Sequence, residues 1–382
     1  MPTDTGRDLM ADIAAFAAHE IAPAAPGWDM GGAPDAAIFA KAAAIGLFGL
    51  ETPVQFGGSG QGFAVKAAAC EALAGADFGF AMSVINTQNV AVRLAHSAPP
   101  ALRNHYLPKI LAGEISACTA LTEPGAGSDF SAAATRARRE GNGWVLDGEK
   151  TWIINARHAG LSVVFAQCGD GASGGGGIGA FLVDLSAPGV RRHAIDSGFS
   201  QSSIGAGGFT LDGLQLGDDH LLLPPGGAYK AIMAEINGAR AYVAAMCCGM
   251  LAAALADAGA YGARRHTFGK PLAGHQAWRL KLAHAQTDLA AARALTGLAG
   301  QAIEQGRDAQ LLAAQAKIHA VGVCQRHLPI MLHAVGAEGL RAEHCFTRHL
   351  GAVQSAALTD GSTDMLLERV AKLTGPAALS KE

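Results

Sequence analysis

Residues 143–154 read GWVLDGEKTWII, and this stretch decides the fold because its pattern differs from the sequence on either side. β-Branched and aromatic residues gather in a short run bounded by Gly and Asp, which is typical of a strand. Similar runs follow at 161–167, 177–185 and 208–216, with Gly, Asp and Pro between them. The pattern predicts a domain of antiparallel strands over residues 116–225.

The chain on both sides of this domain has helical periodicity. Apolar residues recur at helical spacing to about residue 113, which predicts a helical domain over 1–115 with helices near 8–21, 36–48 and 63–73. Patterns rich in Ala and Gly are typical of a helical bundle. Such patterns occur throughout the last predicted domain, 226–382, and predict helices at 230–262, 272–304, 308–335 and 362–373. The predicted fold class is therefore α+β, mostly α.

The glycine run at 169–179 lies between two predicted strands. A dinucleotide-binding glycine motif follows a strand and opens a helix. We therefore predict that this run is a hairpin loop, and that the chain contains no Rossmann unit.

The composition is that of a globular protein: 50% of the 382 residues are hydrophobic, 16% are charged, and the net charge is -3. This balance excludes a basic nucleic-acid-binding protein and a polybasic membrane anchor. The N-terminus is acidic where a signal peptide would be basic. The apolar run at 241–256 is shorter than the roughly 20 residues that span a bilayer, so we expect a buried core helix and no membrane partner.

The cysteines are odd in number and form no CxxC pair or Cys/His cluster with zinc spacing. We expect reduced core thiols in a cytoplasmic protein and no metal site. The seven are Cys70, Cys118, Cys168, Cys247, Cys248, Cys324 and Cys345.

Two segments have the residue types of a ligand site. ALTEPGAGSD, at 120–129, is a strand end followed by glycines and hydroxyls, where backbone N–H groups could approach a flat or phosphorylated ligand. A plain tight turn is the alternative. RRHTFGKPLAGHQA, at 264–277, opens a helical hairpin with Arg265, Phe268 and Gln276 in one local cluster. An arginine suits a pyrophosphate because its forked donors match phosphate oxygens.

Together with IGLFGLETPVQFGGSG (45–60), YLPKILAGE (106–114) and GEKTWIINA (148–156), these segments resemble the flavin-dependent acyl-CoA dehydrogenases over essentially the whole chain. The resemblance implies an N-terminal helical domain, a middle β-barrel and a C-terminal four-helix bundle. It also implies FAD as cofactor and a homodimer or homotetramer.

Residue by residue, the resemblance implies an FAD site between the β domain and the bundle. Leu121, Thr122 and Ser128 match positions that hold the flavin ring and pyrophosphate, and Trp152 matches the ring-covering tryptophan. Ile154 stands where many members have a threonine near the flavin N5, so a hydrogen bond is lost there. Further contacts are implied for a second group, of which the first three reach the FAD of a neighbouring subunit: Arg265, Phe268, Gln276, His333, Gly336, Ser362 and Asp364.

Some of these residues have simpler interpretations. Arg265 could form a surface salt bridge, and His333 could be a satisfied histidine at a helix end. His333 and Ala337 also depart from the family's Q..GG.G turn.

The catalytic base is expected in LTDGSTDMLLER (358–369), which places Asp360 where the family usually has a glutamate. An aspartate is shorter by one carbon–carbon bond, roughly 1.5 Å. Some members carry the base on the helix before the RxxFG segment, but Ala239 stands at that position and Glu235, one turn away, has no motif support. Helix capping by Asp360 or Ser362 is the alternative.

The predicted activity is α,β-dehydrogenation of an acyl thioester, with α-proton abstraction by Asp360. The acyl group would ride on CoA or on an acyl carrier protein, and electrons would pass to an electron-transfer flavoprotein or to oxygen. Alternatives are a nitroalkane-oxidase-like flavin oxidase, an enzyme that oxidises hydroxyacyl groups on a carrier protein, and a non-enzymatic relative. A carrier would dock on a basic patch, unless the arginines form only a solvated face: Arg136, Arg138, Arg139, Arg191 and Arg192.

Overall fold

The computed structural model describes residues 5–169, 177–196 and 202–375. The first domain is helical, as predicted. Asp35 and Asp77 start two of its helices, because their side chains accept hydrogen bonds from the backbone N–H groups of Ile38 and Phe80. The helices are α1 (Thr5–Phe16), which continues as a π-helix (Ala17–Ile21), α2 (Ala22–Asp29), α3 (Ala36–Ala44), α4 (Phe63–Ala76), α5 (Phe78–Ser97) and α6 (Pro100–Leu111), with 3-10 turns at Leu47–Gly49 and Val54–Phe56.

The middle domain is a mixed sheet in the order β6-β7-β3-β2-β4-β5-β8, with β1 beside β4. Most neighbours are antiparallel, but β1 and β2 each pair with β4 in parallel. The prediction of a wholly antiparallel domain is therefore wrong. The strand runs carry no signal for the partner of a strand that is distant in sequence. The strands are β1 (Ala117–Ala120), β2 (Arg136–Glu140), β3 (Gly143–Ile153), β4 (Leu161–Cys168), β5 (Ile178–Asp184), β6 (Val190–Ala194), β7 (Gly207–Gly217) and β8 (Leu221–Leu223).

Alternate residues of β4 explain how the sheet is covered on both faces. Leu161, Val163 and Phe165 pack with α5, α6 and the first turns of the C-terminal domain. Val164 and Ala166 face the other way, into a cluster contributed only by the strands and their connections. β4 is thus a buried strand with apolar residues at nearly every position. Residues 170–176, which include most of the predicted glycine loop, lie outside the described residues.

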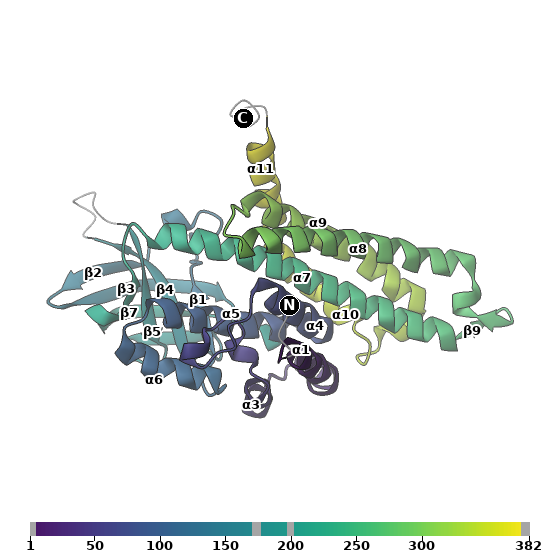
Figure 1. The fold of residues 1–382 in the computed structure, drawn as a ribbon, viewed down its shortest axis with the longest axis horizontal. Coiled ribbons are helices and arrows are strands. Elements are labelled where there is room, and N and C mark those ends of the chain that lie inside the picture. The colour runs from purple at the N-terminus through teal and green to yellow at the C-terminus, as the bar shows by residue number, and fades with distance from the viewer. Residues whose placement is uncertain (1–4, 170–176, 197–201, 376–382) are drawn as a thin grey trace.

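The last domain is a helical bundle, and its fourth helix is α10 rather than the predicted 362–373. That segment forms α11, which projects from the bundle (Figure 1). α10 is short and buries two polar side chains near its start, Arg348 and His349, so its buried face does not appear as an apolar stripe in the sequence. The elements are α7 (Ala228–Arg264), β9 (His266–Thr267), β10 (Lys270–Pro271), a 3-10 turn (Leu272–Gly274), α8 (Gln276–Glu304), α9 (Gln310–Val335), a 3-10 helix (Gly336–Leu340), α10 (Phe346–Leu358) and α11 (Thr363–Thr374).

Small residues let α4 of the first domain pack closely on α7. A Cβ on Gly249 would lie 2.0 Å from the carbonyl oxygen of Glu71, so only glycine fits at this contact. The abundance of Ala and Gly therefore reflects close helix packing, and the order of domains predicted from the sequence is confirmed.

By length and composition α7 is the one helix, among those described, that could cross a membrane. However, 67% of its apolar window is buried inside the protein, and residues 241–251 are all buried. α7 is therefore the core helix that the sequence predicts.

Candidate functional site

The TEPGAGS turn lies directly beside the end of β3. The backbone N–H of Thr151 donates to the carbonyl of Thr122 at 3.0 Å, and Lys150 Nζ donates to the carbonyl of Leu121, also at 3.0 Å. The structure thus brings Leu121 and Thr122 next to the segment that carries Trp152. The turn closes on itself through reciprocal backbone hydrogen bonds between Glu123 and Ala126.

A buried ion pair holds this turn in place. Lys150 Nζ lies 2.7 Å from Glu123 Oε1, and both side chains are almost fully buried. Glu123 also accepts hydrogen bonds from the backbone N–H groups of Ala134 and Thr135. Burial lowers the pKa of Lys150. Burial also opposes ionisation of Glu123, but Lys150 and the backbone donors outweigh it and hold the pKa of Glu123 below its usual value.

Sequence reasoning missed the pair of Glu123 and Lys150. Glu123 stands in the TEPG segment and Lys150 in the GEKTW segment. The available signal was Lys150, a charged residue near the end of a predicted strand. A buried charge needs a partner, so Lys150 in β3 implied a nearby carboxylate.

The surface beside the turn is open and apolar. Ser128 is exposed, and a Cβ on Gly125 or Gly127 would meet no atom within 4 Å. Trp152 is 62% exposed, which is unusual for a tryptophan. Ile154 is partly buried against the main apolar core.

Arg265, Phe268 and Gln276 lie at the far end of the long axis from the sheet, on and beside the β9–β10 hairpin (Figure 1). All three are exposed, Phe268 to 98%. The alternative interpretation of Arg265, a surface salt bridge, is not supported, because Arg265 forms no ion pair with any residue that the structure describes. The hairpin between α7 and α8 therefore presents an aromatic ring and an unpaired guanidinium to whatever lies beyond this chain.

The turn at His333 and Gly336 belongs to the same end of the bundle. Trp278, in the first turn of α8, donates its indole N–H to the carbonyl of Ala334 at 3.0 Å. His333 is exposed. One chain thus carries separate groups of the predicted FAD residues: one at the sheet, one at the hairpin end, and Ser362 and Asp364 at the start of α11.

Four residues other than glycine have left-handed backbone in the described part of the chain: Trp152, Asn155, Phe268 and Asp360. Such a conformation is uncommon for a side-chain-bearing residue, and strain of this kind clusters at functional sites. Three of the four are residues that the sequence assigns to the site. The unusual backbone conformation therefore supports the assignment of Trp152, Phe268 and Asp360 to a functional site.

Asp360 lies in the turn between α10 and α11, with a φ of 52°. The carboxylate is partly buried, and no described residue donates a hydrogen bond to it. Burial raises the pKa of Asp360, while the positive charges of Lys317 and Arg240 lower it, and the net shift is upward. An unpartnered carboxylate with a raised pKa has the properties of a general base.

Glu235, the other acidic candidate for the catalytic base, already has an ion-pair partner. Glu235 forms an ion pair with Arg93, which joins α7 to α5. Ala239 lies one turn further along α7 and offers no titratable group. Asp360 is therefore the better candidate base.

Ser362 has a structural role in the same turn. It is the N-cap of α11, and its side chain accepts from the backbone N–H of Met365 at 3.4 Å. The capping interpretation thus holds for Ser362 and not for Asp360. Asp364 is exposed in the first turn of α11, where a negative charge is favourable.

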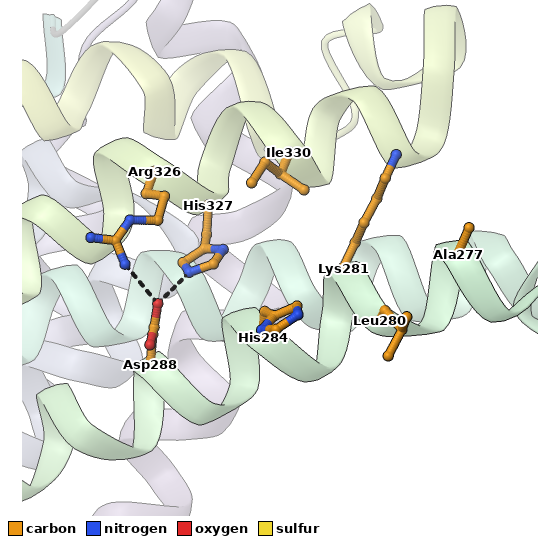
Figure 2. Close-up of a pocket in the computed structure, with 8 residues that line it drawn as sticks. All are labelled: Ala277, Leu280, Lys281, His284, Asp288, Arg326, His327 and Ile330. Atoms are coloured by element: carbon orange, nitrogen blue, oxygen red, sulfur yellow. Dashed lines mark hydrogen bonds and ion pairs between the residues drawn. The ribbon is translucent and has the colours of Figure 1, made fainter.

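A pocket of about 500 Å³ opens between α8 and α9, as Figure 2 shows. Asp288 accepts from His327 at 2.7 Å and from Arg326 at 3.0 Å there. None of the predicted site residues lines it. The lining residues are Ala277, Leu280, Lys281, His284, Asp288, Arg326, His327 and Ile330.

The predicted basic patch is largely neutralised within the domain. Arg138 pairs with Glu140, Arg139 with Asp218, and Arg191 with Asp212. Arg192 donates to the carbonyl of Ala156 at 2.6 Å. These contacts favour the solvated charged face over a docking site.

Metal and disulfide chemistry have no support here. No group of three or more candidate ligands exists within residues 5–169, 177–196 and 202–375. All seven cysteines are buried and free.

The residues present fit a flavin dinucleotide. The sheet end offers an open glycine turn, an exposed hydroxyl at Ser128 and a bare indole at Trp152 for a flat ring. Arg265 and Phe268 at the hairpin offer a guanidinium for a pyrophosphate and a second bare ring.

Comparisons with known proteins agree with this geometry. Three family models match in order: the acyl-CoA dehydrogenase N-terminal domain over 3–114, the middle domain over 118–214 and the C-terminal domain over 227–374. Benzylmalonyl-CoA dehydrogenase of Aromatoleum aromaticum is 30% identical over 97% of this chain and 98% of its own length. Human mitochondrial short-chain specific acyl-CoA dehydrogenase is 29% identical, covering 95% and 88%.

Among solved structures, glutaryl-CoA dehydrogenase from Mycobacterium smegmatis in complex with FADH2 superposes with a TM-score of 0.90. It is 26% identical and covers 98% of this chain and 96% of its own. The predicted fold and FAD as the cofactor are thereby confirmed. The similarity extends through all three domains, and the chain belongs to the acyl-CoA dehydrogenase family.

Proposed function

We propose that this protein removes one hydrogen from each of the α and β carbons of an acyl-CoA, with Asp360 as the base. The observation that carries the proposal is the Asp360 carboxylate, which is partly buried, lies on left-handed backbone and accepts no hydrogen bond from any residue that the structure describes. No other acid with motif support competes, because Glu235 is paired with Arg93.

The chain's own part in the reaction is to take a proton and to hold the cofactor. Asp360 accepts the α-proton as the double bond forms, and its raised pKa makes it a better proton acceptor than an exposed carboxylate. Bound FAD supplies the acceptor for the hydride that leaves the β carbon. Thr122, Ser128 and Trp152 would hold it at the sheet, and the ion pair of Glu123 and Lys150 fixes their turn.

Acyl-CoA is a better substrate candidate than an acyl group on a carrier protein. Most arginines of the proposed docking patch already pair with Glu140, Asp218 and Asp212 on the same domain. The named relatives act on CoA esters of different size and polarity, so the acyl group is to be found by assay.

We also propose that the FAD site is completed by a second copy of the chain. The exposed Phe268 and Arg265, which has no ion-pair partner among the described residues, lie beside β9, at the far end of the long axis from the sheet, so they serve a neighbouring site in a dimer or tetramer (Figure 1). The seven buried thiols suit a reducing compartment, and we propose the cytoplasm.

The arrangement predicts the effect of Arg265→Ala. Loss of the guanidinium should weaken FAD retention by about ten- to a hundredfold, since a charge-assisted hydrogen bond is worth about 1.5–3 kcal/mol. Equilibrium dialysis of flavin, with native mass spectrometry for the assembly, measures this. The matched control is Arg264→Ala, the neighbouring exposed arginine, which should leave flavin retention unchanged. Equal retention in both variants would contradict the role of Arg265.

The activity is tested by the product. Purified protein loaded with FAD is incubated with butyryl-CoA, 2-methylbutyryl-CoA, glutaryl-CoA and benzylmalonyl-CoA and a dye as electron acceptor, and the CoA esters are analysed by mass spectrometry. We expect one of them to lose two hydrogens, with little oxygen uptake when the dye is omitted. Oxidation of nitroethane with oxygen uptake, and no change in any CoA ester, would instead support the oxidase alternative.

A further inference from the structure

Three successive carbonyl groups around Asp360 are held by two buried cations. Lys317 Nζ, from α9, donates to the carbonyl of Thr359 and, at 2.6 Å, to that of Gly361. Arg240 Nε, from α7, donates to the carbonyl of Asp360 at 3.0 Å. The side chains of Lys317 and Arg240 are only 1% and 3% exposed.

This arrangement fixes an uncommon backbone shape. Asp360 has left-handed backbone and Gly361 has a φ of 104°, so the turn departs twice from ordinary geometry. Hydrogen bonds from Lys317 to the carbonyls on both sides leave Asp360 little freedom to rotate. The conformation of the turn is therefore determined by hydrogen bonds from α7 and α9 rather than by the backbone preferences of its own residues.

We propose that Lys317 is a positioning residue for the base: it holds the turn that presents Asp360 and supplies a positive charge beside the carboxylate. The inference rests on the proposed function, in which Asp360 accepts the α-proton. The simpler alternative is that Lys317 only satisfies the last carbonyls of α10, as cations commonly do at helix C-termini.

The charges that face this turn come from three helices and the turn itself. The charged groups are Arg240 on α7, Lys317 on α9, Arg369 on α11 and Asp360 in the turn, and the thiol of Cys247 on α7 is the other titratable group. Burial lowers the pKa of Lys317 to about 8, although Asp360 opposes the shift. Lys317 is thus a cation below that pH. In that range it favours the ionised form of Asp360.

The test compares Lys317→Gln with Lys317→Arg, both as FAD-loaded protein. Removing a cation raises the pKa of a nearby carboxyl, so Asp360 should stay protonated to higher pH. The readout is the infrared carbonyl band of the protonated Asp360 carboxyl, identified as the band that Asp360→Asn removes. We expect its midpoint to rise by about one pH unit in Lys317→Gln and by much less in Lys317→Arg.

Lys66→Gln is the matched control, because Lys66 is also 1% exposed but pairs with Glu51 in the first domain. It should lower the stability of the protein and leave the Asp360 midpoint unchanged. A midpoint that is the same in wild type and Lys317→Gln would overturn the inference. If Lys317→Gln does not fold, Lys317→Arg decides the question. Because this variant keeps the positive charge, a rise of about one pH unit in its Asp360 midpoint would overturn the inference.

The infrared measurement needs no substrate, so the two proposals fail separately. If no acyl-CoA reduces the flavin but the midpoint rises in Lys317→Gln, the proposed function fails and the placement of Lys317 stands. If acyl-CoA reduces the flavin and the midpoint does not move, only the role of Lys317 fails.

Discussion

Asp360→Asn should bind FAD normally and lose flavin reduction by acyl-CoA. An amide cannot take the α-proton, and a general base contributes on the order of 10² to 10⁴-fold to a rate. The carboxylate accepts no hydrogen bond from any residue that the structure describes, so the substitution should leave the fold intact. Anaerobic stopped-flow absorbance of the bound flavin measures the reduction rate.

The matched control is Asp360→Glu, which keeps the carboxylate and restores the length usual in the family. Misplacement by about 1 Å can cost on the order of a hundredfold, so this variant reports how far the site is adapted to the shorter acid. Wild-type reduction kinetics in Asp360→Asn would remove Asp360 from the mechanism.

Lys150→Met should destabilise the protein strongly and release FAD. Lys150 is fully buried and leaves Glu123 as an unpaired buried carboxylate when it is removed. Breaking such a pair costs about 3–5 kcal/mol. The turn that carries Thr122 also loses a donor to its Leu121 carbonyl. Urea unfolding gives the stability, and ultrafiltration gives the bound flavin.

The double variant Glu123→Gln with Lys150→Met separates charge from packing. It removes both charges, so we expect it to recover part of the lost stability, because an uncompensated carboxylate no longer lies buried. If Lys150→Met alone changed stability by less than about 1 kcal/mol, the pair would not be the support of the turn.

The order of the domains could be predicted from the sequence because the residue patterns of helices and strands are local. Apolar spacing shows that α7 and α9 are helices, and β-branched runs such as 161–167 show strands. The pairing of β4 with β1 and β2 is not local, so the parallel neighbours could not be predicted. α10 was missed because it is short and because Arg348 and His349, two polar residues, lie on its buried face.

In the candidate site, too, the local groupings could be predicted from the sequence and the contacts between distant segments could not. Leu121, Thr122 and Trp152 were assigned from contiguous motifs, and the structure places them together. Lys317 stands 43 positions before Asp360 in the chain, and no spacing rule joins them. Only the packing of α9 on the turn places its ammonium between two carbonyls. The separation of Arg265 from the sheet also needed the structure.

The central claim is that an acyl-CoA reduces the flavin of this protein. The most direct measurement is the anaerobic absorbance of the FAD-loaded protein at about 450 nm, where oxidised flavin absorbs, titrated with the panel of CoA esters. The account predicts that one of them bleaches this band in proportion to the enoyl-CoA formed. A flavin that dithionite reduces but that no CoA ester bleaches would contradict it.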